Sequence, residues 1–391
     1  MPLLHPLPFP PIHPPQILLA GATTYIGGTV LSVLLHQPTY PLEHTTITCL
    51  VRSNDCANIL LRAYGEGVNI VVRNSLDDTE IATEIASKHD IVINCAPSSH
   101  APAAIALMEG LAKRRRKTGR DVWMLHTSGM ENLADLPISR KWVHAGPVRE
   151  FDDAKDDIYE FEVMREAQCS HPQRTTELQI INKGLELGVK TIVIMNAMIY
   201  GRGLGLFDRS GVPISAHAKV AMASGKNVVI GDGKGTWDHV HVQELGELYK
   251  IVVVEMMKDG GKKLPCGKKG IIFCGNGRHS WSEVAQEVAK ICCEEGFVSQ
   301  NKVKHVGLEE GVKLFSPYIP ELVKEEDVIE LQLCSNSKTV SNVARKLGWR
   351  PAWREDTWKD AIREDVRSVL QPVHNSQSDA IQESRNSAYI W

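Results

Sequence analysis

The chain has 391 residues, of which 43% are hydrophobic and 23% are charged, and its formal net charge is −3. This composition is typical of a globular protein with one large core or two adjoining cores, and it excludes a disordered chain. Without an excess of positive charge, the chain is not expected to bind nucleic acid. The nine cysteines are scattered without a CxxC pair, which indicates a reducing compartment.

The chain begins with a proline-rich segment, residues 1–15, which we predict to be a mobile arm because it lacks the features of a signal peptide. No later apolar run reaches the roughly 18 residues that cross a bilayer, so we expect a cytoplasmic protein with no membrane association. The basic run Lys113 to Lys117 follows an apolar helical pattern. We interpret it as the solvated end of a helix, the alternatives being a nuclear address and a phosphate-binding patch.

From residue 16 onward, short apolar runs alternate with helical patterns. Strands are predicted at residues 17–21, 46–52, 68–73, 90–96, 122–129 and 190–201. Helices are predicted at residues 26–36, 57–67, 81–89, 104–114 and 175–188. This alternation predicts an α/β fold with a doubly wound parallel sheet of the Rossmann type.

The regular alternation of strands and helices ends near residue 202, after which we predict loops, single helices and short strands. We predict a dinucleotide-binding domain at 16–202 and a smaller mixed substrate-binding subdomain mainly at 203–371, with 227–260 returning to the first domain. The clearest later helices are predicted at 280–296 and 337–349. Residues 372–391 are polar and are predicted to be a loosely held tail.

The stretch AGATTYIGG, from Ala20 to Gly28, connects the first strand to the first helix. Glycines here would permit a tight turn and close helix packing, so that the helix N-terminus faces a pyrophosphate. Thr24 stands where a third glycine is expected, and its branched side chain narrows the approach unless its hydroxyl donates to a phosphate oxygen. The alternative is a turn that uses glycine only for packing. The predicted cofactor contacts in this turn are Gly21, Thr23, Thr24, Tyr25, Ile26 and Gly27.

The end of the second strand bears on the choice of cofactor. NAD-binding folds usually have an acidic residue there to accept hydrogen bonds from the ribose, whereas this chain has Arg52 in CLVRSND. An arginine can bind a 2′-phosphate, which favours NADP(H) over NAD(H). The alternative is a solvated arginine at a strand end.

Several ordered motifs together resemble one protein family. They are AGATTYIGG, CLVRS, NSLDD at 74–78, HTSG at 126–129, IYGRG at 199–203 and GDGKGTWDHVHVQEL at 231–245. In order and spacing the chain resembles the extended short-chain dehydrogenase/reductases, and in particular a fungal group similar to NAD-dependent epimerases and dehydratases. The resemblance covers residues 16 to about 347. It implies a nicotinamide cofactor, with its adenine near Leu76 and Asp77.

The same resemblance implies where the rest of the cofactor would lie. The nicotinamide ribose would lie near Asn94 to Ala96, with Asn94 and Ala96 as contacts, and the ring would lie beside Thr127, Ser128 and the loop from Asn196. The alternative for Asn94, Ala96 and Asn196 is the hydrogen bonding of strand-end turns.

The family's chemistry uses a tyrosine as general acid, with a lysine four residues later. None of the eight tyrosines of this chain has a lysine at that spacing. The family's spacing places Ser170 and Arg174 where tyrosine and lysine would stand, so the usual dyad is absent.

Other residues must then carry the chemistry, if chemistry takes place. Ser128 stands where the family has a serine or threonine that orients the substrate carbonyl. His171 could exchange a proton, because a histidine side chain titrates near neutral pH. Arg174 could hold the cofactor or a substrate oxygen. Tyr159, expected in an acidic loop, is a further candidate donor. The alternatives are a turn serine, a surface histidine and a solvated tyrosine. No metal site is expected at His239 and His241.

We therefore expect an NADP(H)-dependent oxidoreductase that acts on a carbonyl or hydroxyl group of a small organic molecule, in the setting of fungal secondary metabolism, and that forms a homodimer. Two alternatives stay open. One is a regulator or redox sensor that binds NADP(H) without turnover, and the other is a cofactor-independent isomerase or cyclase on the same fold.

Overall fold

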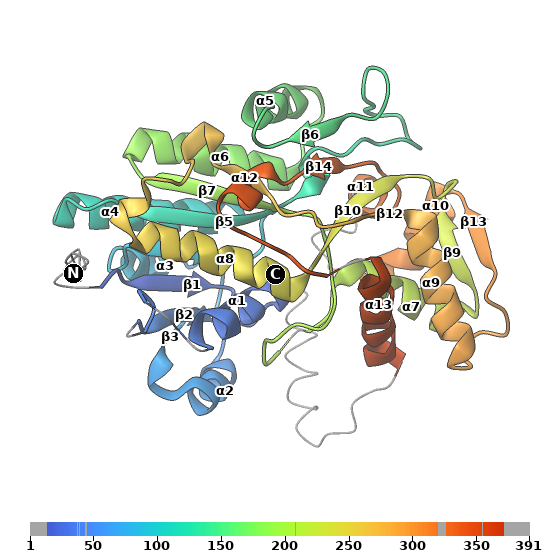
Figure 1. Ribbon diagram of the computed structural model, residues 1–391, viewed down its shortest axis with the longest axis horizontal. Helices are drawn as coiled ribbons and strands as arrows, with labels where there is room; N and C mark the ends of the chain where they lie inside the picture. Colours follow the sequence, from blue (N-terminus) through green and yellow to red (C-terminus); the bar gives the residue numbers. More distant parts are fainter. Residues whose placement is uncertain are drawn as a thin grey trace, which may run out of the picture.

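The computed structural model describes residues 14–36, 38, 40–43, 45–207, 209–319, 326–353 and 355–370. Its largest element is a sheet of seven parallel strands in the order β11-β7-β5-β4-β1-β2-β3 (Figure 1). The strands are β1 Ile17–Ala20, β2 Ile47–Val51, β3 Val68–Val72, β4 Ile91–Asn94, β5 Trp123–Gly129, β7 Lys190–Asn196 and β11 Ile271–Phe273. This order and direction confirm the predicted α/β fold class with a Rossmann-type sheet.

Helices cover both faces of this sheet because successive strand residues point to opposite sides. Ile17 and Leu19 pack in the core under one set of helices, and Leu18 and Ala20 pack under the other. The first set is α1 Tyr25–Leu35, α2 Asn54–Tyr64 and α8 Val242–Met257; the second is α3 Thr79–Ala86, α4 Ala101–Thr118 and α6 Pro172–Leu187. In Figure 1, α1 and α8 lie on the same face of the sheet.

The remaining elements build three small sheets and the helices around them. The small sheets have the orders β12-β10-β8, β13-β9 and β14-β6. Their strands are β6 Glu150–Asp152, β8 Met198–Tyr200, β9 Asn227–Ile230, β10 Thr236–His241, β12 Arg278–Ser280, β13 Val303–Val306 and β14 Lys338–Val340. The other helices are α5 Ile158–Gln168, α7 Val212–Ser224, α9 Trp281–Glu294, α10 Leu308–Phe315, α11 Glu326–Leu333, α12 Asn342–Lys346 and α13 Glu355–Leu370. Figure 1 shows α7, α9, α10, β9 and β13 gathered to one side of the large sheet.

Several predicted segments differ from the observed elements. The run 190–201 divides into β7 and β8, and β8 leaves the large sheet to pair with β10. The helix predicted at 337–349 begins instead as β14, because Lys338–Val340 pairs with Glu150–Asp152 before α12 starts. Within the segment 227–260, α8 covers the large sheet, while β9 and β10 belong to small sheets.

Two predicted segments fall largely outside the described residues: the proline-rich arm, of which only residues 14 and 15 are described, and the tail 372–391. Over the described ranges, the helices are all too short or too polar to cross a bilayer.

Candidate functional site

The turn after β1 requires glycine at two positions. Gly21 has a φ of +86°, and a Cβ added there would lie 2.5 Å from the carbonyl of Cys95, just beyond β4. A Cβ added at Gly27 would lie 2.0 Å from the carbonyl oxygen of Gly21. Because side chains cannot approach a backbone so closely, α1 packs against the sheet edge only with glycine at both positions. The start of α1 thereby lies at the carboxyl ends of β1 and β4.

Thr24 closes this turn with its own side chain. It is the N-cap of α1 with extended backbone angles, φ −82° and ψ 166°, so the position does not need the conformational freedom of glycine. Its hydroxyl accepts from the amide of Gly27 at 3.1 Å and donates to the carbonyl of Gly21 at 2.9 Å. Tyr25 and Ile26 are the first two helical residues, so their amides have no acceptor within α1. Thr23 is half-buried beside them.

The side chain of Tyr25 holds the segment that follows β8. Its hydroxyl donates to the carbonyl of Gly201, and a Cβ at Gly203 would lie 3.0 Å from its ring. The amide of Leu204 donates to the hydroxyl of Thr29 at 3.2 Å. This segment therefore packs along α1 close to its N-terminus.

Two arginines follow the adjacent strands β2 and β3. Arg52 follows β2 and is half-buried. Arg73 follows β3, and its amide donates to the carbonyl of Val51 at 2.7 Å, which places the two arginines on adjacent strand ends. The Arg73 side chain is 5% exposed, and its Nη1 is buried with no hydrogen-bond partner in the described part of the chain. Arg73 was not among the predicted cofactor contacts, although it ends a strand that the sequence pattern predicts.

The segment after β3 carries the residues expected near the adenine. Leu76 is buried, at 8% exposure. Asp77 is exposed and lies 3.2 Å from Nε2 of His100, the N-cap residue of α4. The segment therefore reaches across to the start of α4.

At the end of β4, the side chain of Asn94 is engaged by its surroundings. Its Oδ1 accepts from the amide of Ala96 at 3.3 Å, and its Nδ2 lies 3.1 Å from Nδ1 of His126. Burial lowers the pKa of His126 to about 3, so this imidazole is neutral. Asn94 and Ala96 thus show the turn hydrogen bonding that was the alternative for them.

Thr127 and Asn196 face α8. The Thr127 hydroxyl lies 2.6 Å from the hydroxyl of Tyr249 and 3.4 Å from the sulfur of Cys95. Asn196 also forms a hydrogen bond with Tyr249, whose pKa burial raises well above its usual value. Because neighbouring residues of a strand point to opposite faces, the Thr127 side chain contacts α8 whereas that of Ser128 contacts α6.

Ser128 faces α6 and a buried carboxyl group. Its hydroxyl donates to Oε2 of Glu177 at 2.5 Å, and Nδ2 of Asn132 donates to Ser128 at 3.3 Å and to the same Glu177 oxygen at 2.8 Å. Asn132 belongs to a short 3₁₀ helix, η2 Met130–Asn132, directly after β5. Ser128 is 3% exposed and Glu177 is fully buried. Glu177 was not among the predicted site residues, because no sequence motif marks a glutamate inside a helix.

A second buried carboxyl group, that of Glu162 on α5, lies against Glu177. Burial raises the pKa of both carboxyls, and the charge of Glu177 raises the pKa of Glu162 further. The positive charge of Arg174 lowers the pKa of both carboxyls. The pair therefore favours holding a shared proton.

Gln173, rather than Arg174, points toward the ends of β4 and β5. Its Nε2 donates to the carbonyl of Gly129 at 3.2 Å and to Oδ1 of Asn132 at 3.3 Å. Its Oε1 accepts from the hydroxyl of Ser98, in the loop after β4, at 2.5 Å. Counting along the sequence missed Gln173 by one position, and one position rotates a side chain by about 100° around a helix.

Arg174 is 1% exposed and binds protein groups with all three guanidinium nitrogens. Nε donates to Glu166 at 2.9 Å, Nη1 donates to the carbonyl of Asn132 at 2.7 Å, and Nη2 donates to the carbonyl of Cys169. These bonds tie η2 to the connection between α5 and α6. Binding of a cofactor or substrate by Arg174 would require some of them to break, and that role stays a prediction.

His171 is the N-cap residue of α6 and is 8% exposed, not a surface residue. Burial, followed by the charge of Arg174, lowers the pKa of His171 to about 4. The imidazole is therefore neutral at pH 7 and is a weaker proton donor than an imidazolium. Its predicted role in proton exchange stays untested.

Tyr159 lies on α5 and not in a loop, which corrects the interpretation of its acidic surroundings. The helix forms because Asp157 caps it, accepting from the amide of Glu160 at 3.0 Å. The Tyr159 side chain is 5% exposed, and its hydroxyl donates to Asn182 of α6 at 2.7 Å. It is thus directed at the far part of α6 and not at Ser128.

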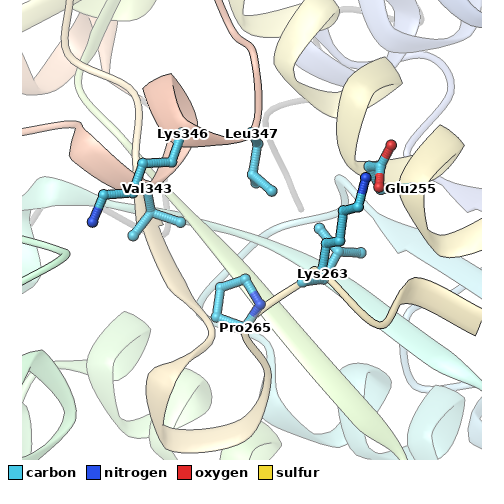
Figure 2. A pocket seen from close by; sticks show the side chains of 7 residues that line it. Glu255, Lys263, Pro265, Val343, Lys346 and Leu347 are labelled. Carbon is cyan, nitrogen blue, oxygen red and sulfur yellow. The ribbon is translucent and has the colours of Figure 1, made fainter.

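A separate pocket of about 550 Å³ opens near the C-terminal end of α8 (Figure 2). Figure 2 shows the amine of Lys263 directed toward the carboxylate of Glu255. The lining residues are Glu255, Lys263, Leu264, Pro265, Val343, Lys346 and Leu347. None of them is a predicted site residue, so this pocket is distinct from the predicted site at the carboxyl ends of the strands.

Comparison with known proteins places this arrangement in a class. Residues 17–264 match the NAD dependent epimerase/dehydratase family, so the chain belongs to that family of Rossmann-type proteins. The chain is 27% identical over 314 residues to "Oxidase ucsJ" of Acremonium sp, covering 76% of this chain and 85% of the relative.

Solved structures share the fold at low sequence identity. PbgP3 from Burkholderia pseudomallei has a TM-score of 0.60 at 14% identity, covering 92% of this chain and 98% of its own. The dTDP-glucose 4,6-dehydratase DesIV from Streptomyces venezuelae, with NAD bound, has a TM-score of 0.60 at 13% identity, covering 91% and 97%. UDP-glucose 4-epimerase from Thermotoga maritima, with UDP-glucose, has a TM-score of 0.56 at 16% identity, covering 91% and 100%.

Proposed function

We propose that this chain binds a nicotinamide dinucleotide and transfers a hydride between that cofactor and a carbonyl or hydroxyl carbon of a small organic molecule. The family membership and the similarity to an oxidase of Acremonium sp support an oxidoreductase. The structural neighbours with NAD bound support a cofactor of the nicotinamide class.

The observation that carries this proposal is the turn between β1 and α1. Gly21 and Gly27 let the helix start at the sheet edge, and the amides of Tyr25 and Ile26 are left without acceptors inside the helix. Backbone amides at a helix N-terminus bind the phosphates of a dinucleotide, and the helix dipole favours their negative charge. The hydroxyl of Thr24, in contrast, is occupied by the turn itself.

For the form of the cofactor we propose NADP(H). Arg52 and Arg73 stand on the adjacent ends of β2 and β3, where the ribose of the adenosine half would lie in this fold. Arginine binds phosphate oxygens through charged, geometrically matched hydrogen bonds.

Equilibrium titration of the purified protein with NADPH and NADH tests the binding step. We expect NADPH to bind at least about tenfold more tightly than NADH, which corresponds to one added charged hydrogen bond. Equal affinities would contradict NADP(H), and no binding of either would contradict the whole proposal. Incubation with ketones, aldehydes and alcohols, followed by absorbance of the reduced nicotinamide, tests turnover.

A second candidate is a protein that binds the dinucleotide without turnover. It is favoured by the absence of the tyrosine and lysine pair and by the burial of Ser128. Tight binding of NADPH with no turnover of any substrate would support it.

A further inference from the structure

A cluster of buried ionisable groups lies directly behind Ser128. Glu162 and Glu177 are both fully buried. Two donors, Ser128 and Asn132, reach a single oxygen of Glu177. The other three carboxyl oxygens of the pair have no hydrogen-bond partner among the described residues. Two ionised carboxylates so placed would be very costly, and a proton between them supplies the missing donor.

The nearby arginines do not donate hydrogen bonds to the two glutamates in the described part of the chain. The charge of Arg174 lowers the pKa of both glutamates, but its nitrogens donate to Glu166 and to two backbone carbonyls. Among the described residues, Arg165 of α5 donates to the carbonyls of Cys169 and Ala134. From η2, the neutral side-chain amide of Asn132 donates to Glu177, and the carboxyl group of Glu131 forms a hydrogen bond with Gln173.

We propose that Glu177, paired with Glu162, is the acid–base group of the reaction and exchanges its proton with the substrate through the hydroxyl of Ser128. The inference rests on the proposed function, since it requires a hydride acceptor or donor of the nicotinamide class. It assigns to a carboxyl pair and a serine the task for which the family pattern has a tyrosine.

In the direction of alcohol oxidation, the substrate O–H bond breaks and its proton goes to the oxygen of Ser128. The proton of Ser128 passes to Oε2 of Glu177 along the 2.5 Å hydrogen bond. The electrons of the substrate O–H bond form the second bond of the carbonyl, and the electron pair of the C–H bond leaves as hydride to the oxidised nicotinamide cofactor. The carboxyl pair thereby goes from one proton to two, and carbonyl reduction is the reverse.

Burial favours this arrangement over direct contact between the substrate and a glutamate. Ser128 is at the end of β5 and 3% exposed, whereas both glutamates are fully buried behind it. The substrate needs to reach only the serine. The neutral state with two protons is also the state that a buried site stabilises, which makes the pair a competent base near neutral pH.

The test compares Glu177→Gln with the parent protein. Glutamine keeps an oxygen that accepts from Ser128 and Asn132 but cannot take up the proton. We expect NADPH affinity to stay within about twofold and kcat to fall by about a hundredfold or more, as for loss of a general base. Glu160→Gln, on the exposed side of α5, is the matched control and should keep the parent's kcat.

The pH profile distinguishes chemistry from a structural effect. Oxidation needs the form of the pair with one proton, so the parent's kcat should rise with pH through the pKa of the pair and then level off. Glu177→Gln should lose this rise, whereas a variant that is only less stable would keep it. Unchanged kcat and an unchanged profile in Glu177→Gln would overturn the inference.

Infrared spectroscopy of the parent gives a result that does not depend on turnover. The stretching band of a protonated carboxyl group should persist to near-neutral pH and should weaken in Glu177→Gln. Absence of the band, or binding of cofactor with no turnover by the parent, would overturn the inference. Failure to bind either cofactor would instead refute the proposed function beneath it.

Discussion

At the level of single residues, Arg52 at the end of β2 tests the proposed preference for NADP(H). We predict that Arg52→Ala weakens NADPH binding by about 1–3 kcal/mol and changes NADH binding little, because only NADPH carries the 2′-phosphate. Isothermal titration calorimetry measures both affinities. Arg62→Ala, an exposed arginine of α2, is the control and should change neither. Equal weakening of both cofactors by Arg52→Ala would refute the assignment.

Gly27 tests the turn itself. The methyl group of Gly27→Ala would lie 2.0 Å from the carbonyl of Gly21, so α1 must shift away from the sheet edge. We expect a loss of about 1–3 kcal/mol in unfolding free energy and at least tenfold weaker NADPH binding. Urea unfolding and cofactor titration measure the two effects. Gly307→Ala is the control, because the added methyl group meets no atom within 4 Å, and its NADPH affinity should equal that of the parent. NADPH binding by Gly27→Ala as tight as in the parent would contradict a phosphate site at this turn.

At the level of elements, α5 and α6 meet through the buried carboxyl pair, and this contact makes stability depend on pH. The folded-state pKa of each glutamate lies above its value in the unfolded chain, so the folded state holds more protons above pH ~4.3. The contribution of the pair is therefore most favourable below that pH and declines as pH rises through the folded-state pKa.

Glu162→Gln removes one of the two buried carboxyl groups, and so removes the cost of ionising the pair at high pH, while its amide can still donate to Glu177. We predict that the variant is more stable than the parent by about 1–3 kcal/mol at pH 8.5 and nearly equal to it at pH 5. Thermal unfolding at both pH values measures the difference. A stability change that is the same at both pH values would show that the effect comes from packing and not from ionisation.

At the level of the whole molecule, α8 of the large sheet is tied to the segment before α13. Oε1 of Glu244 accepts from the amides of Ala352 and of Trp353, the latter at 2.7 Å. The carbonyl of Glu244 accepts from Nε1 of Trp349 at 2.8 Å. A single glutamate thus connects residues more than a hundred positions apart.

We predict that Glu244→Ala lowers the unfolding free energy by about 2–4 kcal/mol, because two partly buried backbone amides lose their carboxylate acceptor. Tryptophan fluorescence reports on the C-terminal segment and circular dichroism on the helices, and in the parent both should follow one transition. Glu247→Ala, exposed on the same helix, should stay within about 0.5 kcal/mol of the parent. A loss no larger than that of Glu247→Ala would refute the role of Glu244.

The sequence by itself determined the elements whose signals are local. Apolar runs of strand length alternate with helical periodicity from Ile17 to Tyr200, and that pattern is enough to predict a parallel sheet with helices on both faces. The glycines at 21 and 27 were predictable because steric exclusion acts within the turn itself. The strand β11 was not predictable, because three residues carry too weak a pattern and their pairing with β7 is decided by the fold.

Only the tertiary structure decided which polar side chains meet. Ser128 and Glu177 are 49 positions apart, and their contact depends on how α6 is rotated against the end of β5. The same rotation directs Gln173 toward the strand ends and Arg174 into the connection between α5 and α6. Spacing along a chain places a residue on a helix to within a position or two, whereas one position turns a side chain by about 100°. For this reason the fold follows from the sequence pattern, and the composition of the site follows from the packing.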